Sequence, residues 1–328
     1  MPTDDVTLSD VYAARQRIAG VALRTPLMHS PALSERAGAE VHLKLESLQN
    51  TGSFKLRGAT NKLLSLSEEE KARGVITVSS GNHGRAVAYA ARSLGIKATV
   101  CLAETVARNK LENIKKLGPE VVVQGKGYDE AVEHSMKIQE KSGLTYLHPF
   151  DDPVVIAGQG TVGLEIVESL PEVDSVLVPL SGGGLISGVA LAMKAANPGI
   201  RVIGVTMEAA PVMYHSLKAG EIVEMEEEPT IADALPGGLG PENFYTFRMC
   251  QELLDDAVLV SEEEIAAAMA FALQEHRLVV EGGAAVGIAA AMQQRAGDLG
   301  ERAAVVVSGS NVDLPLLLKI AQEHGAAN

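Results

Sequence analysis

Val75-Ile76-Thr77-Val78-Ser79-Ser80-Gly81-Asn82-His83-Gly84 is the stretch that decides the fold, because a short β-branched run leads there through polar residues into an Ala-rich segment. Its first four residues predict a buried strand, and the segment from Gly84 to Ala91 predicts a helix. The same alternation follows, with strands predicted at 98–102 and 120–123 and helices at 109–117 and 128–141. Continuous apolar strands separated by helices are typical of a parallel sheet covered on both faces.

The alternation restarts after His148-Pro149-Phe150-Asp151-Asp152-Pro153, a stretch rich in Pro and Asp that indicates a crossing between domains. Beyond it we expect three strands and two helices, namely strands at 175–180, 201–205 and 303–307 and helices at 185–196 and 265–276. The predicted fold class is therefore α/β, with two doubly wound sheet lobes and a site at the carboxyl ends of the strands.

Length and composition exclude several classes of protein. The chain has 328 residues, of which 46% are hydrophobic and 21% charged, as in ordinary globular proteins of one large or two smaller domains. The formal net charge of −14 argues against nucleic acid and anionic membranes as partners, since both select for Lys and Arg. No apolar run reaches a membrane-spanning length, and the N-terminus does not resemble a signal peptide. We therefore expect a soluble, cytoplasmic protein in which Cys101 and Cys250 are buried free thiols.

Ser181-Gly182-Gly183-Gly184 follows one predicted strand and opens the next helix. Consecutive glycines let backbone N–H groups converge on one point, and a helix N-terminus adds partial positive charge, so the loop can bind phosphate. It is not a Walker A loop, because no Lys-Ser or Lys-Thr follows, and it lacks the glycine spacing of a dinucleotide-binding fingerprint. The alternative is a tight turn in which the glycines serve only packing.

Lys55 is the candidate nucleophile. It lies in Thr51-Gly52-Ser53-Phe54-Lys55-Leu56-Arg57-Gly58-Ala59, after a turn and before a helix predicted to run through Asn61 to Leu64. Most lysines are solvated surface charges, and that is the alternative here. With Phe54 and Leu56 as neighbours, however, the amine would lose its charge more readily and attack carbonyl groups.

Two further polar loops follow predicted strands. Ser79-Ser80-Gly81-Asn82-His83-Gly84 places hydroxyls, an amide and backbone N–H groups at a helix start, where they could bind a carboxylate, although Ser80 or Asn82 could act only as a helix cap. Ser308-Gly309-Ser310-Asn311 follows the strand at 303–307, and its alternative is a simple Ser/Gly turn. Three polar loops at strand ends together with one lysine favour a catalytic site.

These segments resemble the serine/threonine dehydratases, a family of fold type II pyridoxal phosphate (PLP) enzymes that includes serine racemase. The resemblance rests on Ser53–Ala59, Ser79–Gly84, Ala157-Gly158-Gln159-Gly160-Thr161, the Ser181 glycine loop and Ser308-Gly309-Ser310-Asn311-Val312-Asp313. It runs from Arg24-Thr25-Pro26-Leu27 to the C-terminus. Within the family, Thr230 to Ala266 is most similar to the hydroxyectoine-utilisation dehydratases.

The resemblance implies a role for each candidate residue. Lys55 would carry PLP as a Schiff base and act as a catalytic residue, with Ser80 as the acid/base on the opposite face. The residues implied to bind the cofactor are Phe54, Lys55, Asn82, Ser181, Gly182, Gly183, Gly184, Leu185 and Ser308, of which Asn82 would bond the ring's 3-hydroxyl and Ser308 would face its nitrogen. The residues implied to bind the substrate are Ser79, Ser80, Asn82 and His83.

The resemblance also implies an arrangement and a reaction. Residues 1–66 and 150–328 would form a large cofactor-binding domain, and residues 67–149 a small domain that closes over the substrate, with the cofactor between the two lobes. The expected reaction is β-elimination on a β-hydroxy amino acid such as L-threonine or L-serine, or on a hydroxyectoine-derived substrate, giving a 2-oxo acid and ammonia. The expected assembly is a homodimer.

Several alternatives stay open from the sequence. Glu208 matches the first ligand of a divalent-cation site in some relatives, but the acidic partner expected after it is missing. Amino-acid racemisation and β-replacement are rival reactions on the same fold. Two alternatives lie outside this fold family. One is a nicotinamide oxidoreductase, but this sequence lacks the glycine fingerprint of that class. The other is a non-catalytic protein that binds a phosphate ligand, in which Lys55 would have no role.

Overall fold

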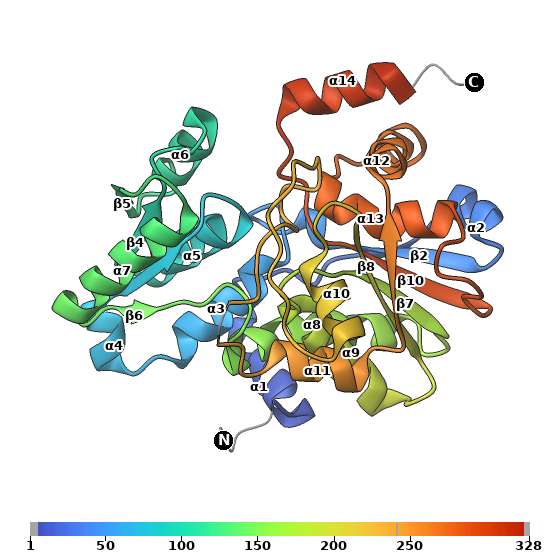
Figure 1. Ribbon diagram of the computed structural model, residues 1–328. Coiled ribbons are helices and arrows are strands. Elements are labelled where there is room, and N and C mark those ends of the chain that lie inside the picture. Colours follow the sequence, from blue (N-terminus) through green and yellow to red (C-terminus); the bar gives the residue numbers. More distant parts are fainter. Residues whose placement is uncertain (1–5, 241, 325–328) are drawn as a thin grey trace.

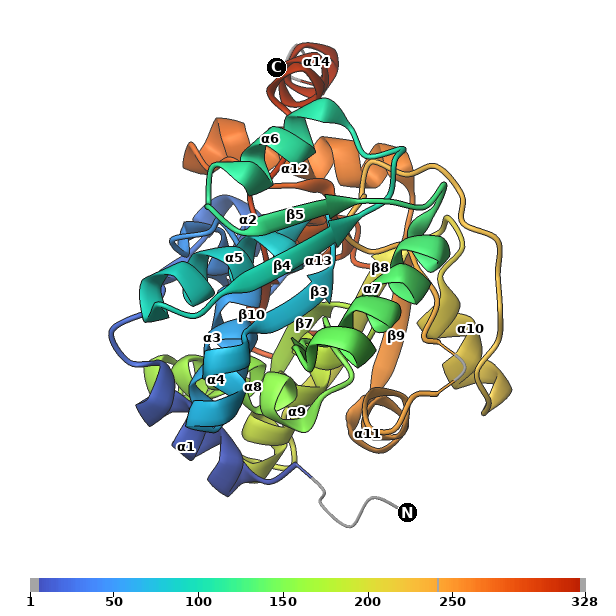
Figure 2. The ribbon, with the colours of Figure 1, turned by 90° about the vertical axis from the view of Figure 1, so that its left-hand side faces the viewer.

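The computed structural model describes residues 6–240 and 242–324, and this part of the chain folds around two β-sheets (Figures 1 and 2). The larger sheet has the spatial order β1 (Leu27–His29), β2 (Glu40–Leu45), β10 (Arg302–Val307), β7 (Ser175–Pro179), β8 (Arg201–Met207) and β9 (Asp256–Val260). All neighbours in it pair in parallel except β1, which runs antiparallel to β2. The smaller sheet is parallel, in the order β5 (Glu120–Val123), β4 (Ala98–Leu102), β3 (Val75–Val78) and β6 (Thr145–Tyr146).

Helices cover both sheets. The lobe of the larger sheet contains α1 (Leu8–Ile18), α2 (Pro31–Ala37), α8 (Pro153–Ser169), α9 (Gly184–Ala196), α10 (Val212–Ala219), α11 (Thr246–Leu253), α12 (Glu262–His276), α13 (Gly282–Met292) and α14 (Leu314–His324), of which α1 packs on α8 and α14 packs on α12. Those next to the smaller sheet are α3 (Lys55–Ser65), α4 (Glu68–Arg73), α5 (Asn82–Leu94), α6 (Arg108–Lys115) and α7 (Tyr128–Ser142). A short 3-10 helix, η1 (Glu46–Leu48), follows β2.

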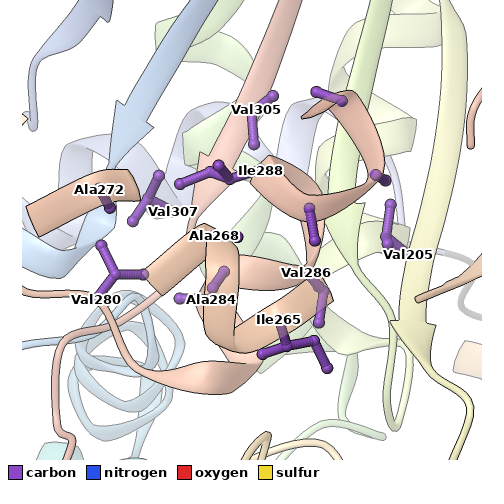
Figure 3. Close-up of a cluster of buried hydrophobic side chains, with 14 of the residues drawn as sticks. Val205, Ile265, Ala268, Ala272, Val280, Ala284, Val286, Ile288, Val305 and Val307 are labelled. Atoms are coloured by element: carbon purple, nitrogen blue, oxygen red, sulfur yellow. The ribbon is translucent and has the colours of Figure 1, made fainter. Parts of the chain in front are cut away.

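Successive residues of a strand point to opposite faces, and the core of the larger sheet is divided accordingly. Val176 and Val178 of β7 pack on one face with apolar residues of α8 and α9. Leu177, between them, packs on the other face with α12 and α13. Figure 3 shows this second cluster, in which Ala, Val and Ile side chains of α12 and α13 meet Val305 and Val307 of β10.

The helix starts follow from local capping. Helices α1, α4 and α12 each begin with a capping box, in which an N-cap hydroxyl and an acidic residue three positions later bond each other's backbone N–H groups. Asp152 caps α8 and accepts from two backbone N–H groups, with Pro153 at the first helical position. The start of α8 is thereby fixed immediately after the polypeptide leaves the smaller sheet.

Helix α3 joins the two lobes. Leu56, Ala59 and Leu63 pack into the core of the smaller sheet with residues of α5. On its other side α3 crosses α8 so closely that a Cβ added at Gly158 would lie 2.7 Å from Cα of Gly58. This crossing positions the start of α3, and with it Lys55, against the larger sheet.

A buried ionic cluster ties the same two helices together. Arg57 of α3 donates to both carboxylate oxygens of Glu165 on α8, at 2.7 and 2.8 Å, and to the carboxylate of Glu46 at 2.7 and 2.8 Å. Lys44 of β2 contacts Glu165 at 2.5 Å. Two cations and two carboxylates balance, as buried charges require.

The predicted α/β class is confirmed, as are the strands predicted at 75–78, 98–102, 120–123, 201–205 and 303–307. The prediction that Lys55 precedes its helix is wrong, because α3 begins at Lys55. Phe54 already has helical backbone angles, and the N–H of Arg57 bonds the carbonyl of Phe54 at 2.9 Å. Cys101 and Cys250 are buried and free, as expected. Within residues 6–240 and 242–324, no helix combines the length and apolar character that spanning a bilayer requires.

Candidate active site

Lys55 is partly buried at the N-terminus of α3. The group that its amine bonds is an uncharged carbonyl, which does not neutralise the positive charge of a protonated amine. Its Nζ donates to the carbonyl oxygen of Pro149 at 2.7 Å and lies 5.3 Å from the ring centre of Phe54. Burial lowers the pKa of Lys55 to about 8. A larger fraction of the amine is therefore neutral near pH 7 than for a surface lysine, as a nucleophile toward carbonyl groups requires.

The segment from His148 to Asp152 organises the surroundings of Lys55. Pro149 supplies the carbonyl for the amine, and the ring of Phe150 lies against the glycine loop after β7. Asp151 accepts hydrogen bonds from the backbone N–H groups of Phe244, Tyr245 and Thr246, at 2.7 to 3.0 Å, at the start of α11. The sequence predicted only a crossing between domains here, whereas the segment contacts three parts of the site.

The glycine loop takes a path that only glycine can follow. Gly183 has a φ of +86°, in the left-handed region, and a Cβ there would lie 2.9 Å from Met213 and from Thr246. A Cβ at Gly182 would lie 2.5 Å from the ring of Phe150. No hydrogen bond between described residues engages the amides of Gly182, Gly183, Gly184 and Leu185 at the start of α9. The loop therefore presents free N–H donors at a helix N-terminus.

The loop from Ser79 to Gly84 begins α5. The hydroxyl of Ser79 accepts from the N–H of Gly81 at 3.2 Å, and a Cβ at Gly81 would meet no atom within 4 Å, so the loop borders open space. His83 is buried, and its Nε2 donates to the carbonyl of Leu147 at 3.1 Å. Burial and then the nearby charge of Lys55 lower the pKa of His83 to about 3, so the imidazole is neutral and its Nδ1 is an acceptor that no described residue bonds.

The loop after β10 lies against the segment that carries Lys55. The N–H of Phe54 bonds the carbonyl of Ser308 at 3.0 Å, and Ser53 forms an isolated bridge with Gly309. Ser308 is 5% exposed, and its hydroxyl takes part in no hydrogen bond between described residues, so it is available to a ligand. Asn311 reaches the other lobe and donates from Nδ2 to Oδ1 of Asn82 at 2.6 Å.

The structure therefore brings most of the candidate residues into one region, while one of them, Ser80, makes no hydrogen bond with a described residue. Phe54 meets Ser308, the charge of Lys55 acts on His83, and Asn82 meets the loop after β10. Ser80 is partly exposed.

Sequence reasoning missed Glu281, which is buried at the start of α13 and accepts from Nδ2 of Asn82 at 2.7 Å. Its signal was a lone acidic residue between Val279-Val280 and Gly282-Gly283 in an apolar stretch. Sequence reasoning also gave no role to the carbonyl of Pro149, because a backbone group leaves no trace in residue type.

The two cysteines add no nucleophile to the site, although Cys250 lies beside the glycine loop, where a Cβ at Gly183 would be 3.1 Å from its Sγ. Burial raises the pKa of Cys250 to about 12 and that of Cys101 to about 11, so neither thiol is a ready nucleophile. Within the described ranges no three His, Cys, Asp or Glu side chains cluster closely enough to hold a metal ion, and Glu208 gains no such neighbours.

The residues fit pyridoxal phosphate. The free amides of the glycine loop suit a phosphate. A Cβ at Gly182 or Gly183 would clash with neighbouring side chains, so the loop requires glycine at both positions. Lys55 has a lowered pKa and, among the described residues, bonds the carbonyl of Pro149 rather than a carboxylate, which suits attachment to an aldehyde. The unpartnered hydroxyl of Ser308 can face a ring nitrogen. The groups that would hold phosphate, aldehyde and ring are thus all present.

Comparison with known proteins gives consistent results. The profile of the family described as "Pyridoxal-phosphate dependent enzyme" matches residues 18–310. The chain is 46% identical over 320 residues to the L-threonine ammonia-lyase of Thermotoga maritima, covering 96% of this chain and 78% of that protein. It is 40% identical over 321 residues to the catabolic L-threonine dehydratase of Escherichia coli strain K12, covering 96% of each. The structure of maize serine racemase superposes with a TM-score of 0.92 at 36% identity, covering 98% of both chains.

Proposed function

The chain belongs to the pyridoxal-phosphate dependent enzymes, and on that premise we propose that it is a lyase of the threonine/serine dehydratase type. It removes the β-hydroxyl and the amine from a β-hydroxy amino acid such as L-threonine or L-serine, releasing a 2-oxo acid and ammonia. Relatives named L-threonine ammonia-lyase and L-threonine dehydratase, at 46% and 40% identity, support this reaction class. A hydroxyectoine-derived substrate is the alternative within the class.

The observation that carries the proposal is the environment of Lys55. Its amine bonds a carbonyl rather than a carboxylate, and burial lowers its pKa to about 8. When bound, pyridoxal phosphate supplies an electron sink for the charge that develops on the substrate Cα. A neutral Lys55 amine can accept the Cα proton near neutral pH, since its pKa lies close to the operating range.

The other candidate residues bind and orient. The amides of Gly182 to Leu185 would hold the phosphate, and Phe54 would lie beside the ring. The first amides of α5, with Ser79, Ser80 and Asn82, would bind the substrate carboxylate, because a helix N-terminus attracts anions. His83 would contribute its backbone N–H, since its Nε2–H is bonded to Leu147. Ser308 offers the ring nitrogen a hydroxyl rather than a carboxylate, which does not favour a protonated ring.

We further propose the arrangement around the site. The division into a large domain (1–66 and 150–328) and a small domain (67–149) is supported by the two separate sheets, with closure of the small domain excluding water from the substrate. A homodimer is supported by the exposed Leu314 and Leu318 on α14, and analytical ultracentrifugation tests it. The two free, buried thiols agree with a cytoplasmic location.

The test is 2-oxo acid release from a panel of β-hydroxy amino acids. Purified protein loaded with pyridoxal phosphate should release a 2-oxo acid from at least one member, and Lys55→Arg should abolish release. Lys62→Arg is the matched control, because Lys62 lies on the same helix and pairs with Asp152, at 2.6 Å, rather than with a residue proposed to bind the cofactor or the substrate. Equal release by the wild type and Lys55→Arg would refute the proposal.

Amino-acid racemisation is the second candidate, because maize serine racemase shares this fold at 36% identity. Racemisation requires a proton donor on the face opposite Lys55, and Ser80 is the candidate. Chiral analysis of the remaining substrate separates the two reactions. If racemisation dominates, D-amino acid accumulates faster than 2-oxo acid and Ser80→Ala removes the D-isomer selectively.

A further inference from the structure

Glu281 is a buried carboxylate to which the reaction outlined above assigns no role. It is 2% exposed and forms the N-cap of α13, in the larger-sheet lobe. Its Oε1 accepts from Nδ2 of Asn82 at 2.7 Å, and its Oε2 accepts from the backbone N–H of Asn311 at 2.8 Å. Because Asn82 begins α5, this carboxylate joins the loops of the two lobes.

The three residues form a closed ring of hydrogen bonds. Nδ2 of Asn311 donates to Oδ1 of Asn82 at 2.6 Å, and also to the carbonyl of Thr51 at 2.9 Å. A side-chain amide has one oxygen and two N–H donors. The ring therefore uses the oxygen of Asn82 and one of its N–H groups, and leaves the second N–H free.

This ring allows Asn82 only one orientation. If its amide turned over, its oxygen would face the carboxylate of Glu281 and its N–H groups would face Nδ2 of Asn311, so two attractive contacts would become repulsive. The surroundings also leave little room for another arrangement. A Cβ at Gly309 would lie 2.5 Å from Oε1 of Glu281, and one at Gly52 would lie 2.7 Å from Oδ1 of Asn311.

An ionised carboxylate is the side chain that suits position 281. Two donors approach it, one on each oxygen, and a carboxylate accepts at both oxygens. A glutamine would accept at one oxygen and set its own N–H groups against the remaining donor. The ring therefore depends on the charge state of Glu281 as well as on its shape.

We propose that Glu281 is a positioning residue that keeps the free N–H of Asn82, rather than its oxygen, available to the 3-oxygen of bound pyridoxal phosphate. This inference rests on the proposed function, because Asn82 contacts that oxygen only if the cofactor binds here. Glu281 acts through Asn82 and touches no reacting atom. Its loss therefore weakens the hold on the cofactor ring.

The charges around Glu281 add a dependence on pH. Burial, opposed by its two hydrogen bonds, raises the pKa of Glu281 to about 7. The charge of Asp233 raises it further, whereas that of Arg85 on α5 lowers it, and Asp233 is itself paired with Lys110 on α6 at 2.8 Å. Protonation would turn one acceptor oxygen into a donor and break one bond of the ring. The hold on Asn82 is therefore weaker below about pH 7.

Two variants of the holoenzyme separate positioning from folding. In Glu281→Gln one donor of the ring loses its acceptor. In the double variant Asn82→Asp/Glu281→Gln the bonds can form with reversed polarity. The introduced glutamine amide can donate to the introduced aspartate and accept from the backbone N–H of Asn311, while Nδ2 of Asn311 still donates to that aspartate. The double variant restores the ring but has no side-chain N–H for the cofactor.

The readouts are the urea midpoint, the rate at which bound pyridoxal phosphate is lost on dilution, and the pH dependence of the visible absorption band. We expect Glu281→Gln to lower the midpoint, to speed cofactor loss roughly tenfold or more, and to remove a titration of the band near pH 7. The double variant should recover the midpoint but not cofactor retention.

Wild-type retention and band titration in Glu281→Gln, or full recovery of retention in the double variant, would overturn the inference. A wild-type protein without a borohydride-sensitive visible band would instead overturn the proposed function, and this inference with it. If Glu281→Gln does not fold, the double variant alone tests the inference. Normal cofactor retention in that protein, which has no amide at position 82, would show that the Asn82 N–H does not hold the cofactor.

Discussion

Replacing Gly158 by alanine tests whether the crossing of α3 and α8 positions Lys55. A Cβ at Gly158 would lie 2.7 Å from Cα of Gly58, 2.9 Å from the carbonyl oxygen of Arg57 and 3.0 Å from the N of Gly58. All three neighbours are backbone atoms, so no side-chain rotation relieves the overlap. Ordinary contact begins at 3.4 Å, and the two helices must therefore separate by about 0.7 Å.

The energetic cost follows from that separation. Overpacking a core contact costs about 1–3 kcal/mol. The same displacement lengthens the bonds of Arg57 to Glu165, now 2.7 and 2.8 Å, toward the limit of a hydrogen bond, and weakens a buried ion pair. We expect Gly158→Ala to lower the free energy of unfolding by about 2–4 kcal/mol. Because Lys55 lies two residues before Arg57, the turnover rate should fall roughly tenfold or more.

Urea unfolding and steady-state 2-oxo acid release measure these two effects. Gly238→Ala is the matched control, since the nearest atom to a Cβ there is 3.8 Å away and its backbone angle permits alanine. The control should change the free energy of unfolding by less than about 0.5 kcal/mol. If Gly158→Ala behaves like the control in both assays, the reasoning that links this crossing to the site is refuted.

Three further predictions concern the site. Gly183→Ala should increase the loss of pyridoxal phosphate on dialysis roughly tenfold, because the φ of Gly183 is +86° and the added Cβ would meet Met213 and Thr246. Unchanged retention of the cofactor would contradict the proposal that the loop binds its phosphate. The rate at which cofactor-free protein gains the visible band should rise with pH and level off above about 8, since only neutral Lys55 attacks; a rise that continues toward pH 10 would contradict the lowered pKa. Finally, the pKa of Glu281 is raised from 4.5 to about 7 in the folded protein, so the folded state binds this proton more tightly than the unfolded state does. The stability that results is fully present below pH 4.5 and is lost as pH rises through about 7. Glu281→Gln has no such proton, so between pH 4.5 and about 7 its free energy of unfolding should rise relative to that of the wild type by up to about 3 kcal/mol. A difference between the two proteins that does not change with pH would contradict the burial of an ionised Glu281.

The parallel α/β fold was predictable because its signal is local. Val75 to Val78 and Ala303 to Val307 are continuous apolar runs next to helical segments, and such runs suit strands buried on both faces. The strand order was not predictable. Strand β10, the last in the chain, inserts between β2 and β7, and that placement depends on contacts between residues more than 250 positions apart, such as Val305 with Leu43.

The candidate site divides in the same way. Lys55 and the glycine loop stand out because a lysine between apolar residues and a run of glycines are unusual locally. Glu281 gave only a weak local signal, because its role comes from Asn82 and Asn311, which reach it from other parts of the chain. The carbonyl of Pro149 gave none, since every residue has a carbonyl. Sequence patterns thus predict the groups that carry the chemistry more readily than those that hold them in place.

Attachment of the cofactor to Lys55 is the central claim, and borohydride reduction followed by peptide mass analysis tests it most directly. The purified protein, supplied with pyridoxal phosphate, should show a visible band that reduction removes, and the reduced cofactor should be found on the peptide that contains Lys55. A protein that gains no band, or one that carries the label on another lysine such as Lys62, would contradict the account.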